Sequence, residues 1–151
     1  MSKIILGSGS PRRRELLAKI GITEFTVSTP EVEESYPDGL SPAQIVCHLS
    51  AIKSRAIESG AEDIVITADT MVFLDDKGLG NPADEADALR MLTALQGRQH
   101  TVCTGVTVRR GAEVLTEAEE TAVFFREATK EEILSYIRSG EPMDKAGSYA
   151  I

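Results

Sequence analysis

Apolar residues follow two kinds of spacing along the chain, and these predict alternating strands and helices. Short apolar runs and strict alternations, which are typical of strands, occupy residues 4–6, 24–28, 63–74, 101–109 and 113–125. Spacings of three and four residues, which are typical of amphipathic helices, begin near residues 11, 42, 84 and 129. Because strands and helices alternate, we expect an α/β layered fold with a mixed sheet.

Residues that favour helix N-termini mark where the predicted helices begin. Ser10, Ser41 and Thr129 are each suited to accept a hydrogen bond from the first turn of a helix. Gln44 and Glu132 stand three residues after Ser41 and Thr129, so both pairs predict a capping box. We expect each helix to end at or near a glycine, namely Gly21, Gly60, Gly97 and Gly140. After the last helix, residues 141–151 predict a loop and the start of another strand.

The loop at residues 7–9 connects the first strand to the first helix. It directs backbone N–H groups and the positive end of a helix dipole to one point, beside Ser8, Arg12 and Arg13. Guanidinium groups pair with phosphate oxygens in a bidentate manner, which favours a polyphosphate ligand. The alternative is a solvated basic face, although positive charge at a helix N-terminus opposes the dipole. The loop is not a P-loop, because the Gly-Lys-Ser/Thr ending is absent.

Composition and charge restrict the class of protein. The 151 residues suit one domain, and the net charge of −8 is the wrong sign for binding nucleic acid by phosphate neutralisation. No apolar run approaches the roughly 20 residues that span a bilayer, and the N-terminus shows no signal-peptide pattern, so we expect a cytoplasmic protein. Cys47 and Cys103 are expected to be reduced thiols in or near the core, without the spacing of a zinc site.

Two charged residues each allow a structural and a functional interpretation. Glu34 lies at the end of the acidic segment 30–34, which is either solvated loop or a source of carboxylates for a divalent cation. Lys53 falls at the edge of the apolar stripe of the second helix. Its stem either carries the ammonium to water or places it in the phosphate pocket. The residues leave both pairs of alternatives open.

Asp69 is the first candidate for a catalytic carboxylate. It follows the apolar run 64–68, which predicts a buried central strand that ends at Asp69 and Thr70 before a second apolar run. A carboxylate at the end of a buried strand is costly unless it is paired, binds a metal or takes part in chemistry. We therefore expect Asp69 to act on the substrate.

Six segments occur in a characteristic order along the chain. They are SGSPRRRELL at 8–17, Glu33 with Glu34, Lys53, TADTMV at 67–72, LGNPAD at 79–84 and PMDKAGSYAI at 142–151. With these segments the chain resembles the Maf family of nucleoside triphosphate pyrophosphatases, once described as septum formation inhibitors. The resemblance runs from one end of the chain to the other.

This resemblance implies a fold like that of the inosine triphosphate pyrophosphatases, with a mixed central sheet, flanking helices and two lobes around a cleft. It implies one such domain over residues 1–151, commonly present as a homodimer. It also implies hydrolysis of a nucleoside triphosphate to the monophosphate and pyrophosphate with a divalent cation, Mg²⁺ or Mn²⁺. The DKAG segment before Tyr149, together with Ala68, Asp69 and Thr70, resembles the branch that prefers dTTP and UTP.

The resemblance also implies roles for single residues. Asp69 is the expected proton acceptor, and Arg12 and Thr70 occupy positions associated with base selection. The phosphate and metal region is expected to be lined by Ser8, Arg13, Glu34, Lys53 and Lys145. Glu34 and Asp69 are the expected metal ligands.

Two departures from the family pattern bear on activity. Asn81 stands in Gly-Asn-Pro where the family usually has Gly-Lys-Pro, and removing one electrostatic donor elsewhere costs roughly 100- to 1000-fold in rate. Family members also continue past Tyr-Gly-Ile with a glutamine implicated in base recognition, so we expect this chain to lack a C-terminal segment. The alternative function is therefore a nucleotide-binding regulator of cell division with weak or no catalysis. A different base preference also stays open.

Overall fold

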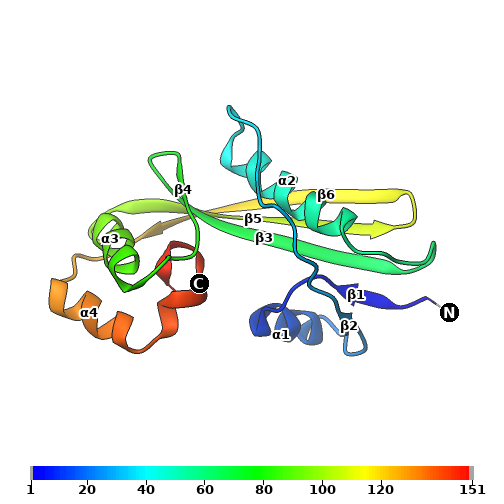
Figure 1. Ribbon diagram of the computed structural model, residues 1–151, viewed down its shortest axis with the longest axis horizontal. Coiled ribbons are helices and arrows are strands. Elements are labelled where there is room, and N and C mark those ends of the chain that lie inside the picture. Colours follow the sequence, from blue (N-terminus) through cyan, green and yellow to red (C-terminus); the bar gives the residue numbers. More distant parts are fainter. Residues whose placement is uncertain (1, 150–151) are drawn as a thin grey trace. The chain divides into compact units, whose positions relative to one another are not determined.

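The computed structural model describes residues 2–149 and has an α/β fold with a mixed six-stranded sheet (Figure 1). The strands are β1 (Ile4–Leu6), β2 (Thr26–Val27), β3 (Ile64–Leu74), β4 (Lys77–Leu79), β5 (Gln99–Arg110) and β6 (Glu113–Phe124). The α-helices are α1 (Pro11–Lys19), α2 (Pro42–Arg55), α3 (Glu85–Leu95) and α4 (Lys130–Arg138). Two short 3₁₀ helices follow, η1 (Glu141–Asp144) and η2 (Ala146–Ser148).

The sheet contains both parallel and antiparallel pairs. Its order is β2-β1-β3-β5-β6, with β4 paired to β3 away from this path. Strand β1 is parallel to both neighbours, so that Ile5 lies opposite Thr26 on one side and Val65 on the other. Strand β4 folds back on β3 as an antiparallel hairpin. The mixed sheet predicted from the alternation of elements is therefore confirmed.

The chain forms two compact units. Within the described residues, unit 1 comprises 2–69 and 104–119, and unit 2 comprises 70–103 and 120–149. Strands β3, β5 and β6 each contribute residues to both units. The two lobes expected of the fold correspond to these units, whereas a single domain over residues 1–151 stays a prediction.

In unit 1, helix α2 packs directly against the sheet. Its buried side chains include Val46 and Leu49. A Cβ atom placed on Gly105 of β5 would lie 2.4 Å from the carbonyl oxygen of Val46, so only glycine allows this approach of helix and strand. A smaller apolar cluster on the same sheet joins Ile5, Ile57 and Val65. Helix α2 thereby has a fixed distance from the central strands.

In unit 2, helices α3 and α4 enclose an apolar core. Its most buried members include Leu95 of α3 and Ile137 of α4, at 0% and 2% exposure. Three rings pack edge to face at one side of this core, with centroid distances of 4.7 to 5.4 Å. They belong to His100, Phe125 and Tyr149. The Nε2 atom of His100 also lies 2.6 Å from the hydroxyl of Tyr149, which ties the end of the described chain to β5.

Three boundaries differ from those predicted. Strand β3 continues through Asp69 and Thr70, so the prediction of a strand end there is wrong. Helix α2 ends at Arg55 rather than near Gly60. Residues 141–144 and 146–148 form η1 and η2 where a loop is predicted. The predicted strand after them falls partly on residues 150–151, outside the described part of the chain.

The reasons for the two errors at β3 and α2 are contacts between distant residues. Asp69 can lie within a strand because its carboxylate pairs with Lys53 of α2. The guanidinium of Arg109 donates hydrogen bonds to the carbonyl oxygens of Ser54 and Ile57, and so satisfies the C-terminal turn of α2 before Gly60. No helix in the described part of the chain is both long and apolar enough to cross a membrane.

Candidate active site

The loop before α1 is held in place by hydroxyl groups. The Ser10 hydroxyl accepts the N–H of Arg13 and caps the helix, as predicted, and Pro11 takes the first helical position. The buried Ser8 hydroxyl accepts the N–H of Ser10 at 3.2 Å and Nη1 of Arg13 at 3.1 Å. The loop and the guanidinium are therefore fixed relative to each other.

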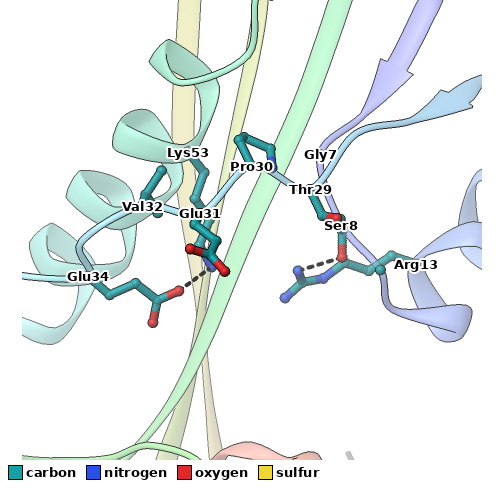
Figure 2. A pocket seen from close by; sticks show the side chains of 10 residues that line it. Gly7, Ser8, Arg13, Thr29, Pro30, Glu31, Val32, Glu34 and Lys53 are labelled. Carbon is teal, nitrogen blue, oxygen red and sulfur yellow. Dashed lines mark hydrogen bonds and ion pairs between the residues drawn. The ribbon is translucent and has the colours of Figure 1, made fainter.

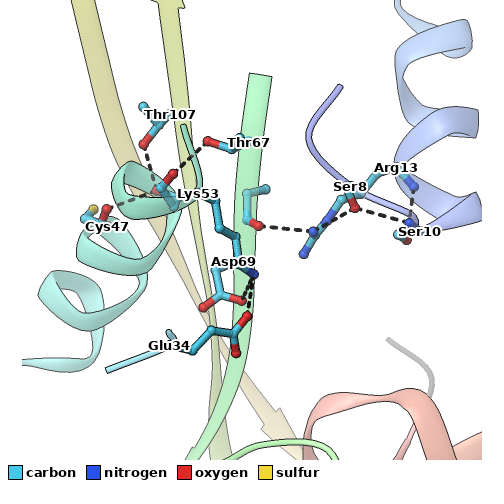
Figure 3. A network of polar contacts seen from close by, with 11 residues as sticks. Ser8, Ser10, Arg13, Glu34, Cys47, Lys53, Thr67, Asp69 and Thr107 are labelled. Atoms are coloured by element: carbon cyan, nitrogen blue, oxygen red, sulfur yellow. Dashed lines mark hydrogen bonds and ion pairs between the residues drawn. The ribbon is translucent and has the colours of Figure 1, made fainter. Parts of the chain in front are cut away.

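The Arg13 side chain crosses from α1 to the central strand. Its Nη1 atom also donates to the carbonyl oxygen of Ala68 at 3.1 Å, one residue before Asp69 (Figure 3). Burial lowers the pKa of the guanidinium, the charge of Asp69 opposes this effect, and Arg12 adds to it. Because the guanidinium of arginine stays protonated in proteins, Arg13 keeps its positive charge beside Asp69.

A second cluster joins Lys53 to two carboxylates. Lys53 Nζ lies 3.1 Å from Asp69 Oδ1 and 3.1 Å from Glu34 Oε1. The Asp69 side chain is 13% exposed, Lys53 is 21% exposed and Glu34 is 57% exposed. The ammonium therefore bridges a nearly buried carboxylate on β3 and an open one on the loop before α2. Of the two interpretations of Lys53, the structure supports the one that places its ammonium at the site.

Burial has the largest effect on the pKa of Asp69. Desolvation raises the pKa of this carboxyl above its ordinary value, whereas the charge and hydrogen bond of Lys53 lower it. The negative charge of Glu34 raises it further, and Arg13 lowers it. A carboxylate with a raised pKa is a better proton acceptor than an exposed one and suits a general base.

Four of the residues described above, Ser8, Arg13, Glu34 and Lys53, line a pocket of about 430 Å³ in unit 1 (Figure 2). Ser8 and Arg13 lie on one side of it, and Glu34 and Lys53 on the other. Its remaining lining residues are Gly7, Gly9, Thr29, Pro30, Glu31 and Val32. Positive groups from α1 and α2 thus face one space. Asp69 is not one of the lining residues, but it forms an ion pair with Lys53, which is.

Part of this lining lies outside the site residues predicted from the sequence. Thr29 and Val32 are not among those residues, and Glu31 belongs to the acidic segment 30–34 without a predicted role of its own. Only their position in the chain could have indicated a place in the lining. They lie in the loop that connects β2 to Glu34, and this loop runs along the pocket. Their side chains carry no pattern of their own that predicts ligand contact.

The two carboxylates could hold a divalent cation whose remaining ligands are water and substrate phosphates. Among the side chains that the structure describes, no group of three or more His, Cys, Asp or Glu could hold a metal ion. Glu34 and Asp69 nevertheless converge on one ammonium, which occupies a position where positive charge is favourable. Mg²⁺ commonly binds one or two carboxylates and completes its shell with water and substrate phosphates. The donor set therefore fits Mg²⁺ or Mn²⁺.

Asn81 and Lys145 lie on neighbouring segments of unit 2. The N–H of Gly147 donates to the carbonyl oxygen of Gly80 at 3.1 Å, which joins the loop carrying Asn81 to the segment carrying Lys145. Lys145 Nζ donates to the carbonyl oxygen of Glu141 at 2.6 Å. The structure thus brings these two predicted residues to one region of unit 2.

The two residues expected to select the base are sequence neighbours of Arg13 and Asp69. Arg12 is exposed in the first turn of α1, next to Arg13. Thr70 follows Asp69 on β3 and is the first residue of unit 2. Their roles in base selection stay predictions.

Solved structures with the same fold include the Ham1 protein of Staphylococcus aureus and a Ham1 protein from Coxiella burnetii. The first has a TM-score of 0.57 at 16% identity and covers 80% of this chain and 70% of its own. The second has a TM-score of 0.54 at 12% identity and covers 81% of this chain and 72% of its own. At these identities the likeness concerns the fold, and it confirms the predicted α/β class.

Other proteins share a much larger fraction of identical residues with this chain than these two structures do. A protein of Symbiobacterium thermophilum named dTTP/UTP pyrophosphatase is 49% identical over 154 residues, which cover 100% of this chain and 78% of the relative. Proteins of the same name from Pelotomaculum thermopropionicum and Bacillus cereus are 46% and 47% identical and are covered over 80% and 74% of their lengths. The family described as Maf-like protein matches residues 3–151. Since this match spans nearly the whole chain, the protein belongs to the Maf-like family.

Proposed function

We propose that the protein hydrolyses dTTP and UTP to the nucleoside monophosphate and pyrophosphate. The observation that carries this proposal is the Glu34–Lys53–Asp69 cluster, in which a nearly buried carboxylate with a raised pKa lies beside the Ser8–Arg13 loop. Relatives that are 46% to 49% identical and carry the name dTTP/UTP pyrophosphatase support this choice of substrate.

Asp69 acts as the general base in this proposal. It accepts a proton from a water molecule whose oxygen forms a bond to the α-phosphorus. The bond from that phosphorus to the bridging oxygen breaks, and the pyrophosphate leaves with the electron pair. Lys53 keeps Asp69 ionised and fixes its orientation through the 3.1 Å ion pair.

Positive and hydrogen-bonding groups hold the phosphates. Ser8 and Arg13 line the pocket at the start of α1, where Arg13 stabilises charge on the phosphate oxygens. Arg12 and Lys145 are proposed to add positive charge as the pyrophosphate leaves, and Arg12 and Thr70 to contact the base. Asn81 is proposed to contact the triphosphate through its amide.

Glu34 and Asp69 are the residues that would hold Mg²⁺ or Mn²⁺. When bound, the cation lowers the pKa of the attacking water and neutralises phosphate charge. Lys53 lies between the same carboxylates and keeps them together before the substrate enters. Chelation of the metal is expected to stop turnover, and added Mg²⁺ or Mn²⁺ is expected to restore it.

The decisive experiment measures pyrophosphate release from dTTP, UTP, CTP and 7-methyl-GTP, each with and without Mg²⁺ or Mn²⁺. We expect metal-dependent turnover of dTTP and UTP and slower turnover of the other two nucleotides. Metal-dependent pyrophosphate release from a different nucleotide would contradict the proposed base preference but support the proposed reaction. No release from any nucleotide would contradict the proposed activity.

A second candidate function rests on Asn81. Asparagine keeps a hydrogen-bonding group but lacks the charge of the lysine expected there, so a protein that binds nucleotides without rapid turnover is the alternative. Isothermal titration calorimetry with dTTP and UTP separates the two functions. Tight binding without pyrophosphate release would favour a nucleotide-binding regulator, such as one acting in cell division.

We further propose that the protein works as a cytoplasmic homodimer. The location stays a prediction from the sequence, and the dimer rests on the family resemblance. Light scattering of the purified protein determines its mass in solution. A mass of about one 16.3 kDa chain would contradict the dimer.

A further inference from the structure

We propose that Thr67 is a positioning residue that holds β3 against α2 so that Lys53 reaches Asp69. The proposal rests on the function assigned to these two residues above. Thr67 is fully buried, is not itself one of the residues that line the pocket, and has no role in the mechanism described above. Its importance follows from what its two side-chain branches contact.

The hydroxyl of Thr67 links β3 to α2, the same two elements that the Lys53–Asp69 ion pair joins. Thr67 and Asp69 are two residues apart on β3, so their side chains leave the same face of the strand. Ser50 and Lys53 are three residues apart on α2, so they lie on one face of the helix. Thr67 Oγ1 donates to the carbonyl oxygen of Ser50 at 2.7 Å, one helical turn before the 3.1 Å ion pair (Figure 3).

Ser50 is itself fixed from the other side. Its hydroxyl donates to the carbonyl oxygen of Cys47 at 3.0 Å and lies 2.8 Å from Thr107 Oγ1. Because a hydroxyl has one proton, Thr107 donates to Ser50, and Thr116, 3.0 Å from Thr107, donates in turn to Thr107. This chain of hydroxyls links α2 to β5 and β6, whereas the Thr67 hydroxyl links α2 to β3.

The methyl group of Thr67 lies against the loop that carries Ser8. A Cβ atom on Gly7 would be 2.6 Å from Thr67 Cγ2, so the methyl group packs on the Gly7 backbone. Thr67 therefore contacts the phosphate loop through its methyl group and α2 through its hydroxyl, two residues before Asp69. One side chain thus sets the spacing of the three parts of the site.

The test replaces the hydroxyl without changing the shape of the side chain. In Thr67→Val the hydrogen bond to Ser50 is lost, and we expect kcat for dTTP to fall about 10- to 100-fold while KM changes little, because displaced catalytic groups lower the rate steeply. Thr67→Ser keeps the hydroxyl and is expected to retain most of the wild-type kcat. Thr107→Val is the matched control, since Thr107 is equally buried and its hydroxyl contacts Ser50 of α2 and Thr116 of β6.

Two outcomes would overturn the proposal. One is a wild-type kcat in folded Thr67→Val, and the other is an equal fall of kcat in Thr67→Val and Thr107→Val, which would indicate a general loss of stability. Crystal structures of both unliganded variants give a measurement that does not depend on activity. We expect the distance from Lys53 Nζ to Asp69 Oδ1 to exceed 3.1 Å only in Thr67→Val.

The structures also separate this proposal from the proposed function. If the wild-type protein hydrolyses no nucleotide but Thr67→Val lengthens the ion pair, the pyrophosphatase function fails and the positioning by Thr67 stands. If the wild-type protein is active and the distance is unchanged in Thr67→Val, the positioning by Thr67 is contradicted and the function stands.

Discussion

Lys53 and Asp69 form an ion pair of 3.1 Å between a helix and the interior of a strand. Asp69 is the more buried partner, and burial of a carboxylate without a partner would be strongly unfavourable. The ammonium lowers the pKa that burial raises, so the ion pair partly offsets the effect of burial on this carboxyl. This balance underlies the first two predictions.

Replacement of Asp69 by asparagine should leave the fold intact and nearly abolish turnover. Asparagine has the same size and can accept the hydrogen bond from Lys53, but it cannot accept a proton from water. We expect kcat to fall by about 100- to 10,000-fold. Circular dichroism checks the fold, and Asp76→Asn, an exposed position on the β3–β4 turn, is the control. Most of the wild-type activity in folded Asp69→Asn would exclude Asp69 as the base.

The pH dependence of kcat/KM should report Asp69. Its pKa is raised above 3.8, mainly by burial, and activity requires the ionised form. Activity should therefore be lost as the pH falls through a value higher than 3.8. In Lys53→Met the group that lowers this pKa is removed, so the remaining activity should be lost at a higher pH than in the wild type. If Lys53→Met loses activity at the same pH as the wild type or at a lower pH, this assignment is contradicted.

Replacement of Asn81 by lysine should raise activity. The residue is exposed in the loop before α3, so a longer side chain fits, and its charge would lie beside the Lys145 segment. If this position contacts phosphate, the gain in kcat/KM approaches the roughly 100- to 1000-fold effect of one electrostatic donor. Ala83→Lys places the same charge on the same loop and should change activity little. An unchanged rate in Asn81→Lys would show that this position does not contact the phosphate.

Asp63 should make stability depend on acid pH. Its carboxylate accepts the N–H of Gly60 at 2.8 Å and of Lys3 at 3.1 Å, and these bonds lower its pKa. A lowered pKa in the folded state contributes stability above the unfolded value, and this contribution is lost as the pH falls through the folded value. Asp63→Asn should therefore unfold at lower urea concentration than the wild type near neutral pH. The difference should disappear at a pH of about 2, and a constant difference would contradict it.

Local signals predicted the elements of the fold well, because helix starts depend on neighbouring residues. Ser10, Ser41 and Thr129 all cap their helices, and both predicted capping boxes are present. The errors occur where a distant residue decides the boundary. Neither the continuity of β3 through Asp69 nor the early end of α2 can be inferred without Lys53 and Arg109 in their folded positions.

The candidate site was predictable as a set of residues but not as an arrangement. Spacing on one helix placed Lys53 at the edge of an apolar stripe, and this left two orientations of its side chain. Only the packing of α2 on β3 selects one of them. Thr67 was unpredictable as a site determinant, because a buried threonine within an apolar strand is ordinary and its partner is a backbone carbonyl.

The composition of unit 1 has a consequence for synthesis of the protein. Ser8, Arg13, Glu34, Lys53 and Asp69 all precede residue 70, yet the unit that holds them also requires residues 104–119. Those later residues include Arg109, which completes the last turn of α2, and Gly105, on which the helix rests. A chain still on the ribosome with only the first half made therefore contains every group of the cluster without its scaffold. The site can assemble only after β5 has left the exit tunnel.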